Sequence, residues 1–195
     1  YDADELLDVA MTFNGQPLPT GNAVGLVTGA GGGMGVIATD SCVKFGLEVP
    51  RFSDETVTRL REILPTYAPV NNPVDLTPIF DPPRLVKCTE IVLQDEKIDS
   101  VISMGFGWRQ DLSSVEIEAV SEFIDLRRYS KPILIASPSS KYEFESLRLL
   151  EASGITVFLT PRKAAFALSC LVSYARRKQQ IRMNRDSQFR TSSLS

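Results

Sequence analysis

Residues 24–35 read Val-Gly-Leu-Val-Thr-Gly-Ala-Gly-Gly-Gly-Met-Gly, an apolar run that passes directly into a glycine-rich loop. A short, continuously apolar run bounded by glycines is typical of a buried parallel strand. Helical spacing follows from Met34 to Phe45, and Gly46 supplies a helix C-terminal signal. The stretch therefore predicts a strand, a glycine loop and a helix, the first unit of an α/β fold.

The same alternation of strand and helix continues along the chain. Ser53 and Asp81 have the residue type and the position of helix N-caps, and Asp81 is followed by two prolines. Five such units predict an α/β, flavodoxin-like domain of three layers, with a five-stranded parallel sheet in the order 2-1-3-4-5 and helices on both faces. The four later strands are expected at 47–50, 100–104, 132–136 and 155–158, and the last helix at about 160–177.

The two ends of the chain differ from its centre. A helical pattern runs through residues 1–20 without an initiating Met, so we expect a helix and linker that lead in from a preceding domain of a longer protein. Residues 21–178 form the predicted flavodoxin-like domain. Residues 179–195, rich in Arg, Ser and Gln, are predicted to be a basic, disordered tail.

The chain has 195 residues, no histidine and a formal net charge of −3. Without histidine it cannot by itself supply a Ser-His-Asp or Cys-His hydrolase site, a His-ligated zinc ion or a phosphohistidine. Residues 176–195 carry six basic side chains and one acidic side chain, so the rest of the chain is acidic. An acidic body does not suit a nucleic-acid binder, and the basic tail either contacts an anionic partner or is simply solvated.

Cysteine usage and hydropathy bear on the location of the protein. Cys42, Cys88 and Cys170 lie far apart in helical patterns, which is typical of buried, reduced thiols in a cytoplasmic protein. No apolar run approaches the roughly 20 residues that a membrane-spanning helix needs. The sequence therefore predicts a cytoplasmic protein with no membrane partner.

The glycine loop is the best candidate for a binding site. Consecutive glycines let the backbone approach a ligand closely, and the following helix adds the positive end of its dipole, so the loop favours an anion, above all phosphate. A Walker A loop is excluded because Met34-Gly35-Val36 stands where Gly-Lys-Ser/Thr is required. The alternative is a tight turn between strand and helix with no ligand. The predicted phosphate-binding residues are Gly31, Gly32, Gly33, Met34 and Gly35.

Other loops at the same edge of the predicted sheet offer weaker candidates. In an open parallel sheet, ligands bind beyond the carboxyl ends of the strands, here expected between the first and third strands. Asp75 is either a site residue or a turn former, and Ser137 has no base on this chain to activate it. No residue is assigned a catalytic role and no metal site is expected. The further candidate site residues are Asn72, Asp75, Gly105, Gly107 and Ser137.

The helix after the glycine loop is apolar on more than one side. Met34, Ile37 and Ala38 fall on one face, whereas Val36 and Val43 fall on another. A helix covered only by its own sheet has a polar outer face. The pattern therefore indicates either a buried central helix or a second domain packed against this one.

Several segments together resemble a known family. They are Val24–Gly32, Gly46-Leu47-Glu48, Ser53-Asp54-Glu55-Thr56, Leu64-Pro65 and Asn72-Pro73-Val74-Asp75-Leu76, in that order. This combination is similar to the C-terminal flavodoxin-like CoA-ligase domain of NDP-forming acyl-CoA synthetases, the group that contains ADP-forming acetyl-CoA synthetase and, more distantly, succinyl-CoA synthetase. The resemblance covers about residues 3–178. Where the family more often has Thr-Asn-Ala-Gly-Gly-Pro-Gly, this chain has an additional glycine and no proline.

The resemblance implies a division of labour between domains. Such enzymes convert an acid, CoA and ATP into acyl-CoA, ADP and phosphate through a phosphorylated histidine. It implies that CoA and Mg-ATP or Mg-ADP bind mainly to other domains, with no covalently bound cofactor here. The implied partners are a His-bearing flavodoxin-like domain and an ATP-grasp domain, and this domain would offer its glycine loop to the phosphohistidine. The alternative is a non-catalytic ligand-binding or protein-interaction module of a fused regulator.

Overall fold

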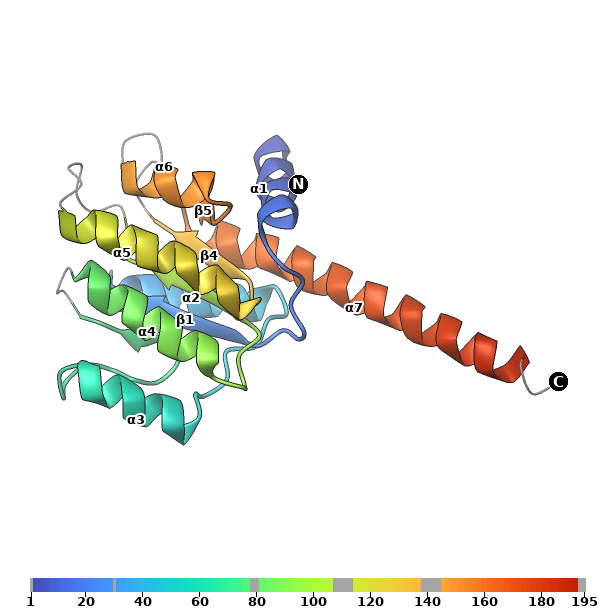
Figure 1. Cartoon of the computed structure of the whole chain (residues 1–195), viewed down its shortest axis with the longest axis horizontal. Helices are drawn as coiled ribbons and strands as arrows, with labels where there is room; N and C mark the ends of the chain where they lie inside the picture. The colour runs from blue at the N-terminus through green and yellow to red at the C-terminus, as the bar shows by residue number, and fades with distance from the viewer. Residues whose placement is uncertain (1, 30, 78–80, 107–113, 138–144, 193–195) are drawn as a thin grey trace.

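The computed structural model describes residues 2–29, 31–77, 81–106, 114–137 and 145–192. Strands and helices alternate along these residues (Figure 1). The strands are β1 (Val24–Thr28), β2 (Val74–Asp75), β3 (Ser100–Met104), β4 (Ile133–Ala136) and β5 (Thr156–Phe158). The helices are α1 (Ala3–Gly15), α2 (Gly32–Lys44), α3 (Asp54–Ile63), α4 (Pro82–Gln94), α5 (Ser114–Asp125), α6 (Glu145–Ala152) and α7 (Pro161–Ser192), with a 3-10 helix at Leu126–Tyr129.

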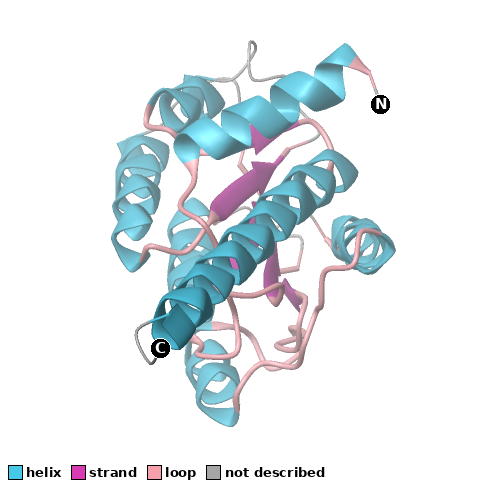
Figure 2. Ribbon diagram, turned by 90° about the vertical axis from the view of Figure 1, so that its right-hand side faces the viewer, coloured by secondary structure: helices cyan, strands magenta, loops and turns pink. Residues whose placement is uncertain are grey.

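The strands form one parallel sheet in the order β2-β1-β3-β4-β5, which confirms the predicted flavodoxin-like architecture. Every residue of β1, β3 and β4 is buried because helices cover both faces of the sheet. One core lies between the sheet and α3, α4, α5 and α6, and the other between the sheet and α2 and α7. Figure 2 looks onto the second face, where α1 and α7 cross in front of the strands.

The edge strand beside β1 is not the one predicted. Within 47–50, Glu48 makes only a single parallel bridge, to Ala23 at the start of β1. The chain then leaves the sheet and returns as β2, where Val74 and Asp75 pair with the end of β1. The prediction of a strand at 47–50 is therefore wrong, and the physical reason is Pro50, which has no N–H to continue a ladder.

The side chain of Asn72 fills the gap between these two edge segments. Its Oδ1 accepts a hydrogen bond from Leu26 N–H at 2.9 Å. Its Nδ2 donates to Val24 O at 2.8 Å and to Pro50 O at 2.9 Å. The side-chain amide thus replaces a missing backbone peptide and satisfies groups in the middle of β1 that would otherwise be buried without partners.

The last helix continues beyond its predicted end. α7 runs to Ser192 instead of stopping near Arg177, so the structure is helical where the sequence pattern predicted a disordered tail. No glycine or proline follows Pro161 in the sequence, and Arg, Lys and Gln favour helix. Figure 1 shows α7 projecting well beyond the sheet.

Helix α1 packs against α7 rather than standing apart from the domain. Lys163 Nζ lies 2.9 Å from Asp8 Oδ2, and the rings of Phe13 and Tyr174 meet edge to face at 5.3 Å. Beyond the helix, Gln16 accepts a hydrogen bond from Ile133 N–H at the start of β4. The N-terminal segment therefore makes specific contacts with the predicted domain, whereas the domain boundaries after residues 20 and 178 stay predictions.

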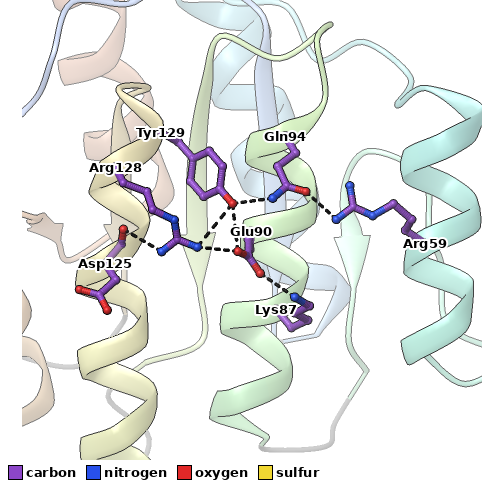
Figure 3. Close-up of polar contacts among 7 residues, drawn as sticks. All are labelled: Arg59, Lys87, Glu90, Gln94, Asp125, Arg128 and Tyr129. Carbon is purple, nitrogen blue, oxygen red and sulfur yellow. Dashed lines mark hydrogen bonds and ion pairs between the residues drawn. The ribbon is translucent and has the colours of Figure 1, made fainter.

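A polar network joins the outer surfaces of α3, α4 and the 3-10 helix (Figure 3). Glu90 lies at its centre, 2.7 Å from Lys87 Nζ and 2.7 Å from Arg128 Nη2, and it accepts a hydrogen bond from Tyr129 OH at 2.9 Å. The hydrogen bond from Lys87 is the largest cause that lowers the pKa of Glu90. Gln94 extends the network to Arg59 on α3.

The three cysteines are free thiols. Cys42 and Cys88 are buried, as predicted, and burial raises the pKa of each thiol to about 12. Cys170 is only partly buried, so the prediction of a buried thiol is wrong for this residue. It lies on α7, and burial raises its pKa as well.

Candidate functional site

The glycine loop connects β1 to α2 at the carboxyl edge of the sheet. Gly31 has φ of 82° and ψ of 169°, a backbone conformation that a residue with a Cβ rarely adopts. Thr28 Oγ1 donates to Gly31 O at 3.3 Å, which ties the loop back to the end of β1. The helix then begins at Gly32, so the N–H groups of its first turn are presented by Gly32, Gly33 and Met34.

The first turn of α2 has no side-chain cap. Asp2, Ser53 and Asp81 each accept a hydrogen bond from the first turn of α1, α3 and α4, respectively. At α2, by contrast, Gly31 is the N-cap, and the first turn contains no acidic residue. The backbone donors and the positive end of the helix dipole at α2 are therefore not satisfied by a local side chain, which favours an external anion.

The crevice expected between the ends of β1 and β3 is closed at its base. Gly29 N–H donates to Met104 O at 2.6 Å. A Cβ on Gly105 would lie 2.9 Å from Leu85 Cδ2 and 3.3 Å from Gly29 Cα, so glycine is needed at 105 for this close approach. Among the described residues, Gly105 therefore serves packing between the two strand ends.

A cavity of about 360 Å³ opens instead on the β2 side of β1, along α2. Its walls include Val36, Pro69 and Pro73, which make much of the lining apolar. Gly32 and Gly35 from the glycine segment also line it. The complete lining is Thr28, Gly32, Gly35, Val36, Thr39, Asp40, Pro69, Pro73 and Asp75.

The charge of this cavity decides where an anion can bind. Asp40 and Asp75 line it, and the described lining residues include no Lys or Arg. Asp75 Oδ2 lies 3.7 Å from the point where a Cβ on Gly32 would stand, close to the first turn of α2. Since a helix N-terminus carries only about half a positive charge, two carboxylates disfavour an anion deep in the cavity. An anion site at this loop would therefore have to lie outside the cavity.

The structure brings some of the predicted site residues together and places others elsewhere. Gly31–Gly35 and Asp75 gather at the start of α2, where Asp75 Oδ1 also accepts from Thr77 N–H at 2.8 Å. Asn72 holds the middle of β1, and Gly105 packs against Gly29. Ser137 is buried at the end of β4, where its Oγ donates to Phe106 O at 2.9 Å. Gly107 lies outside the described residues.

Six residues that line the cavity were not among the predicted site residues: Thr28, Val36, Thr39, Asp40, Pro69 and Pro73. Asp40 and Thr39 lie two turns along α2 from the loop, and Pro69 and Pro73 flank the segment that returns to the sheet. The helical spacing from Gly32 places Asp40 on the same side of α2, a signal that could have identified it. The two prolines gave no comparable signal, because their approach to α2 depends on where β2 joins the sheet.

The rest of the described chain adds two findings. None of its helices combines the length and the apolar character needed to cross a bilayer. Over the same residues, acidic and thiol side chains do not gather in groups of three or more that could hold a metal ion.

Comparison with known proteins points to one family. The model of the ligase-CoA domain matches residues 24–148. The ADP-forming acetate–CoA ligase II of Archaeoglobus fulgidus is 32% identical over 185 residues, which cover 92% of this chain and 27% of that protein. The alpha subunit of the ADP-forming acetate–CoA ligase II of Pyrococcus furiosus is 32% identical over 179 residues, covering 89% of this chain and 38% of the subunit. The chain thus spans less than half the length of these relatives.

Solved structures share the fold. A protein of Pyrococcus horikoshii OT3 superimposes with a TM-score of 0.79 at 30% identity, over 90% of this chain and 41% of that chain. The dinucleotide-forming acetyl-coenzyme A synthetase 1 of Candidatus Korarchaeum cryptofilum, solved with phosphate and ADP, gives a TM-score of 0.78 at 21% identity. That match covers 94% of this chain and 39% of the other.

Proposed function

The chain belongs to the ligase-CoA domain family, and we propose that it works as one domain of an NDP-forming acyl-CoA synthetase. The proposed overall reaction converts an acid, CoA and ATP into acyl-CoA, ADP and phosphate. Two curated relatives of which the chain covers 27% and 38% are ADP-forming acetate–CoA ligases, which supports this assignment. In the proposal, CoA and Mg-ATP or Mg-ADP bind mainly to other domains. Residues 21–178 form the domain whose glycine loop faces the phosphoryl group.

The observation that carries the proposal is the uncapped first turn of α2. A phosphoryl group on a histidine of a neighbouring flavodoxin-like domain would accept hydrogen bonds from the N–H groups of Gly32, Gly33 and Met34. The chain has no histidine of its own, so the reacting group must come from that partner. The role of this chain is then electrostatic: preorganised backbone donors stabilise the charge without reacting themselves.

The outer face of α2 offers a surface for that partner. Val36, Ile37 and Val43 are 61%, 49% and 63% exposed, whereas the opposite side of the helix packs on the sheet and α7. The interpretation of α2 as a fully buried central helix is therefore wrong. We infer that the His-bearing domain covers these side chains, which would exclude water from the phosphoryl group.

Gly33 allows a direct test because its position is open. A Cβ on Gly33 would have no heavy atom within 4 Å, so a substitution there leaves the fold intact. In the complete synthetase, Gly33→Asp places a carboxylate among the phosphate donors, and we expect acyl-CoA formation to fall by about a hundredfold or more, the range for losing one oxyanion donor. Gly33→Asn is the matched neutral control and should lose much less.

The formation of the phosphoenzyme from radiolabelled ATP distinguishes this proposal from its alternative, a non-catalytic module. A smaller amount of phosphohistidine in the Gly33→Asp variant, with normal nucleotide binding, would support a phosphate-stabilising role for the loop. Equal activity of the Asp and Asn variants and of the unmodified synthetase would refute the role of the loop. A non-catalytic module would instead leave acyl-CoA formation unchanged when the whole glycine segment is altered.

A further inference from the structure

The glycine loop and the cavity beside it make opposite electrostatic demands. The uncapped first turn of α2 favours an anion, whereas Asp40 and Asp75 place two negative charges along the adjoining cavity. Asp75 Oδ2 lies 3.7 Å from the point where a Cβ on Gly32 would stand, so one carboxylate is close to that first turn. A positive charge in the cavity would remove the conflict, and the described lining residues include no Lys or Arg to supply it.

Both carboxylates are available to an incoming cation. Asp75 is fixed in β2, where it pairs with Thr28, and its Oδ1 accepts a hydrogen bond from Thr77 N–H at 2.8 Å. Within the described part of the chain, its Oδ2 has no hydrogen-bond partner, and the exposed carboxylate of Asp40 makes no hydrogen bond or ion pair. A cation inside the cavity is therefore attracted by both carboxylates without breaking an existing contact.

The walls of the cavity favour a cation that is carried on an apolar stem. Val36, Pro69 and Pro73 supply apolar surface. Lysine and arginine side chains bury their methylene groups against such surface while the charged end reaches polar groups. A hard metal ion needs about six oxygen ligands, and over the described residues acidic and thiol side chains form no group of three or more. The lining therefore suits a basic side chain better than a metal ion.

The surface next to the cavity indicates where this side chain comes from. Val36 lines the cavity and is also exposed on α2, together with Ile37 and Val43. Several exposed apolar side chains on one helix are typical of a surface that another protein domain covers. Because Val36 belongs to both features, a domain that packs on this part of α2 also reaches the cavity.

We propose that a lysine or arginine side chain of the domain that covers α2 enters this cavity and pairs with Asp40 and Asp75. This inference rests on the proposed function, in which that domain carries the phosphorylated histidine. Docking then brings the cation and the phosphoryl group to α2 together, and the carboxylate beside the loop is neutralised when the anion arrives. The loop consequently favours phosphate most strongly in the assembled enzyme.

Site-specific cross-linking in the complete synthetase tests which segment reaches the cavity. A diazirine amino acid in place of Ile37, which is exposed beside the cavity, should react with the His-bearing domain at a segment that contains Lys or Arg. Mass spectrometry of the digested product identifies that segment. The same amino acid in place of Glu118, exposed on α5 at the opposite face of the sheet, is the control and should not give this product.

A charge exchange then tests the ion pair itself. Replacing the basic residue of that segment by Glu should lower the yield of the Ile37 cross-link by about tenfold, because a like charge would face the two carboxylates. Adding Asp40→Lys should restore most of the yield, since opposite charges meet again. Asp40 is exposed, so its replacement should leave the melting temperature unchanged. Glu118→Lys is the matched control and should restore nothing.

Three results would overturn the proposal. They are an Ile37 cross-link to no other domain, a cross-link to a segment without Lys or Arg, and a yield that Asp40→Lys restores no better than Glu118→Lys. Each is distinguishable from failure of the proposed function, which the Gly33 variants test. Loss of phosphohistidine in Gly33→Asp without restoration by Asp40→Lys keeps the loop and rejects the ion pair. Restoration with equal activity of the Gly33 variants keeps the ion pair and rejects the role of the loop.

Discussion

At the scale of single residues, Asn72 shows how one side chain can decide the edge of a sheet. Its amide makes three hydrogen bonds, to Leu26, Val24 and Pro50, and so joins two edge segments that are each too short to pair with the whole of β1. The sequence made it a candidate site residue because it lies in a loop expected at the carboxyl edge of the sheet. In the structure, the contacts that define it are those of a partly buried structural amide.

Replacing Asn72 by Asp should destabilise the domain. Asp has the same shape but cannot donate, so Val24 O and Pro50 O would lose their partner and a carboxylate would face two carbonyl oxygens. We expect the free energy of unfolding to fall by about 1–3 kcal/mol, measured by urea denaturation. Asn71→Asp, at the exposed neighbouring position, is the control. Equal effects of the two variants would contradict the structural role of Asn72.

At the scale of elements, two helix N-caps could be predicted more reliably than the segment that pairs with the edge of β1. Ser53 and Asp81 cap α3 and α4 as predicted, because a cap depends on only three or four consecutive residues. The strand predicted at 47–50 fails, since pairing depends on which distant segment occupies the edge of β1. The end of α7 lies later than the sequence pattern predicted. The composition favoured a solvated tail, but uninterrupted helix-forming residues continue the helix to Ser192.

The network around Glu90 predicts a pH dependence that belongs to this scale, because it links α3, α4 and the 3-10 helix. The folded-state pKa of Glu90 is lowered from 4.5, so its stabilising contribution is present above that value and is lost as the pH falls through the folded-state pKa. Glu90→Gln should lower stability near neutral pH by about 0.5–1 kcal/mol, given that much of the network is exposed.

The difference in the free energy of unfolding between Glu90→Gln and the unmodified chain should then become smaller below pH 4.5. Chemical denaturation at a series of pH values provides the measurement. Glu118→Gln, an exposed position on α5 outside the network, is the control and should show no such pH-dependent difference. A constant difference between pH 7 and pH 3 would show that Glu90 does not stabilise the fold through its charge.

At the scale of the whole molecule, two cores lie on opposite faces of one sheet. Cys88 belongs to the core under α3, α4, α5 and α6, and Cys42 to the core under α2 and α7. Both cores share β1, β3 and β4, so the faces should open together rather than separately. α1 adds a further contact to the second face only.

The buried thiols can report this cooperativity. At pH 8, Cys42 and Cys88, each with a pKa of about 12, should react with a thiol reagent only after unfolding and with the same opening free energy. Cys170 is partly exposed and should react first. Single-cysteine variants monitored by mass spectrometry would distinguish the three sites. Much faster labelling of Cys42 than of Cys88 would show that the α2–α7 face opens independently.

The sequence by itself determined the alternation of strands and helices, the parallel sheet and the uncapped glycine loop before α2, because these features depend on neighbouring residues. Membership of the family followed from the same local segments and is confirmed by the match at residues 24–148. The phosphate-binding role of Gly31–Gly35 stays a prediction. Only the tertiary structure decided that β2 lies at Val74–Asp75, that Asp40 and Asp75 line one cavity, and that α1 turns its leucines outward. The reason is physical: each of these features depends on which segments, distant in the chain, come into contact.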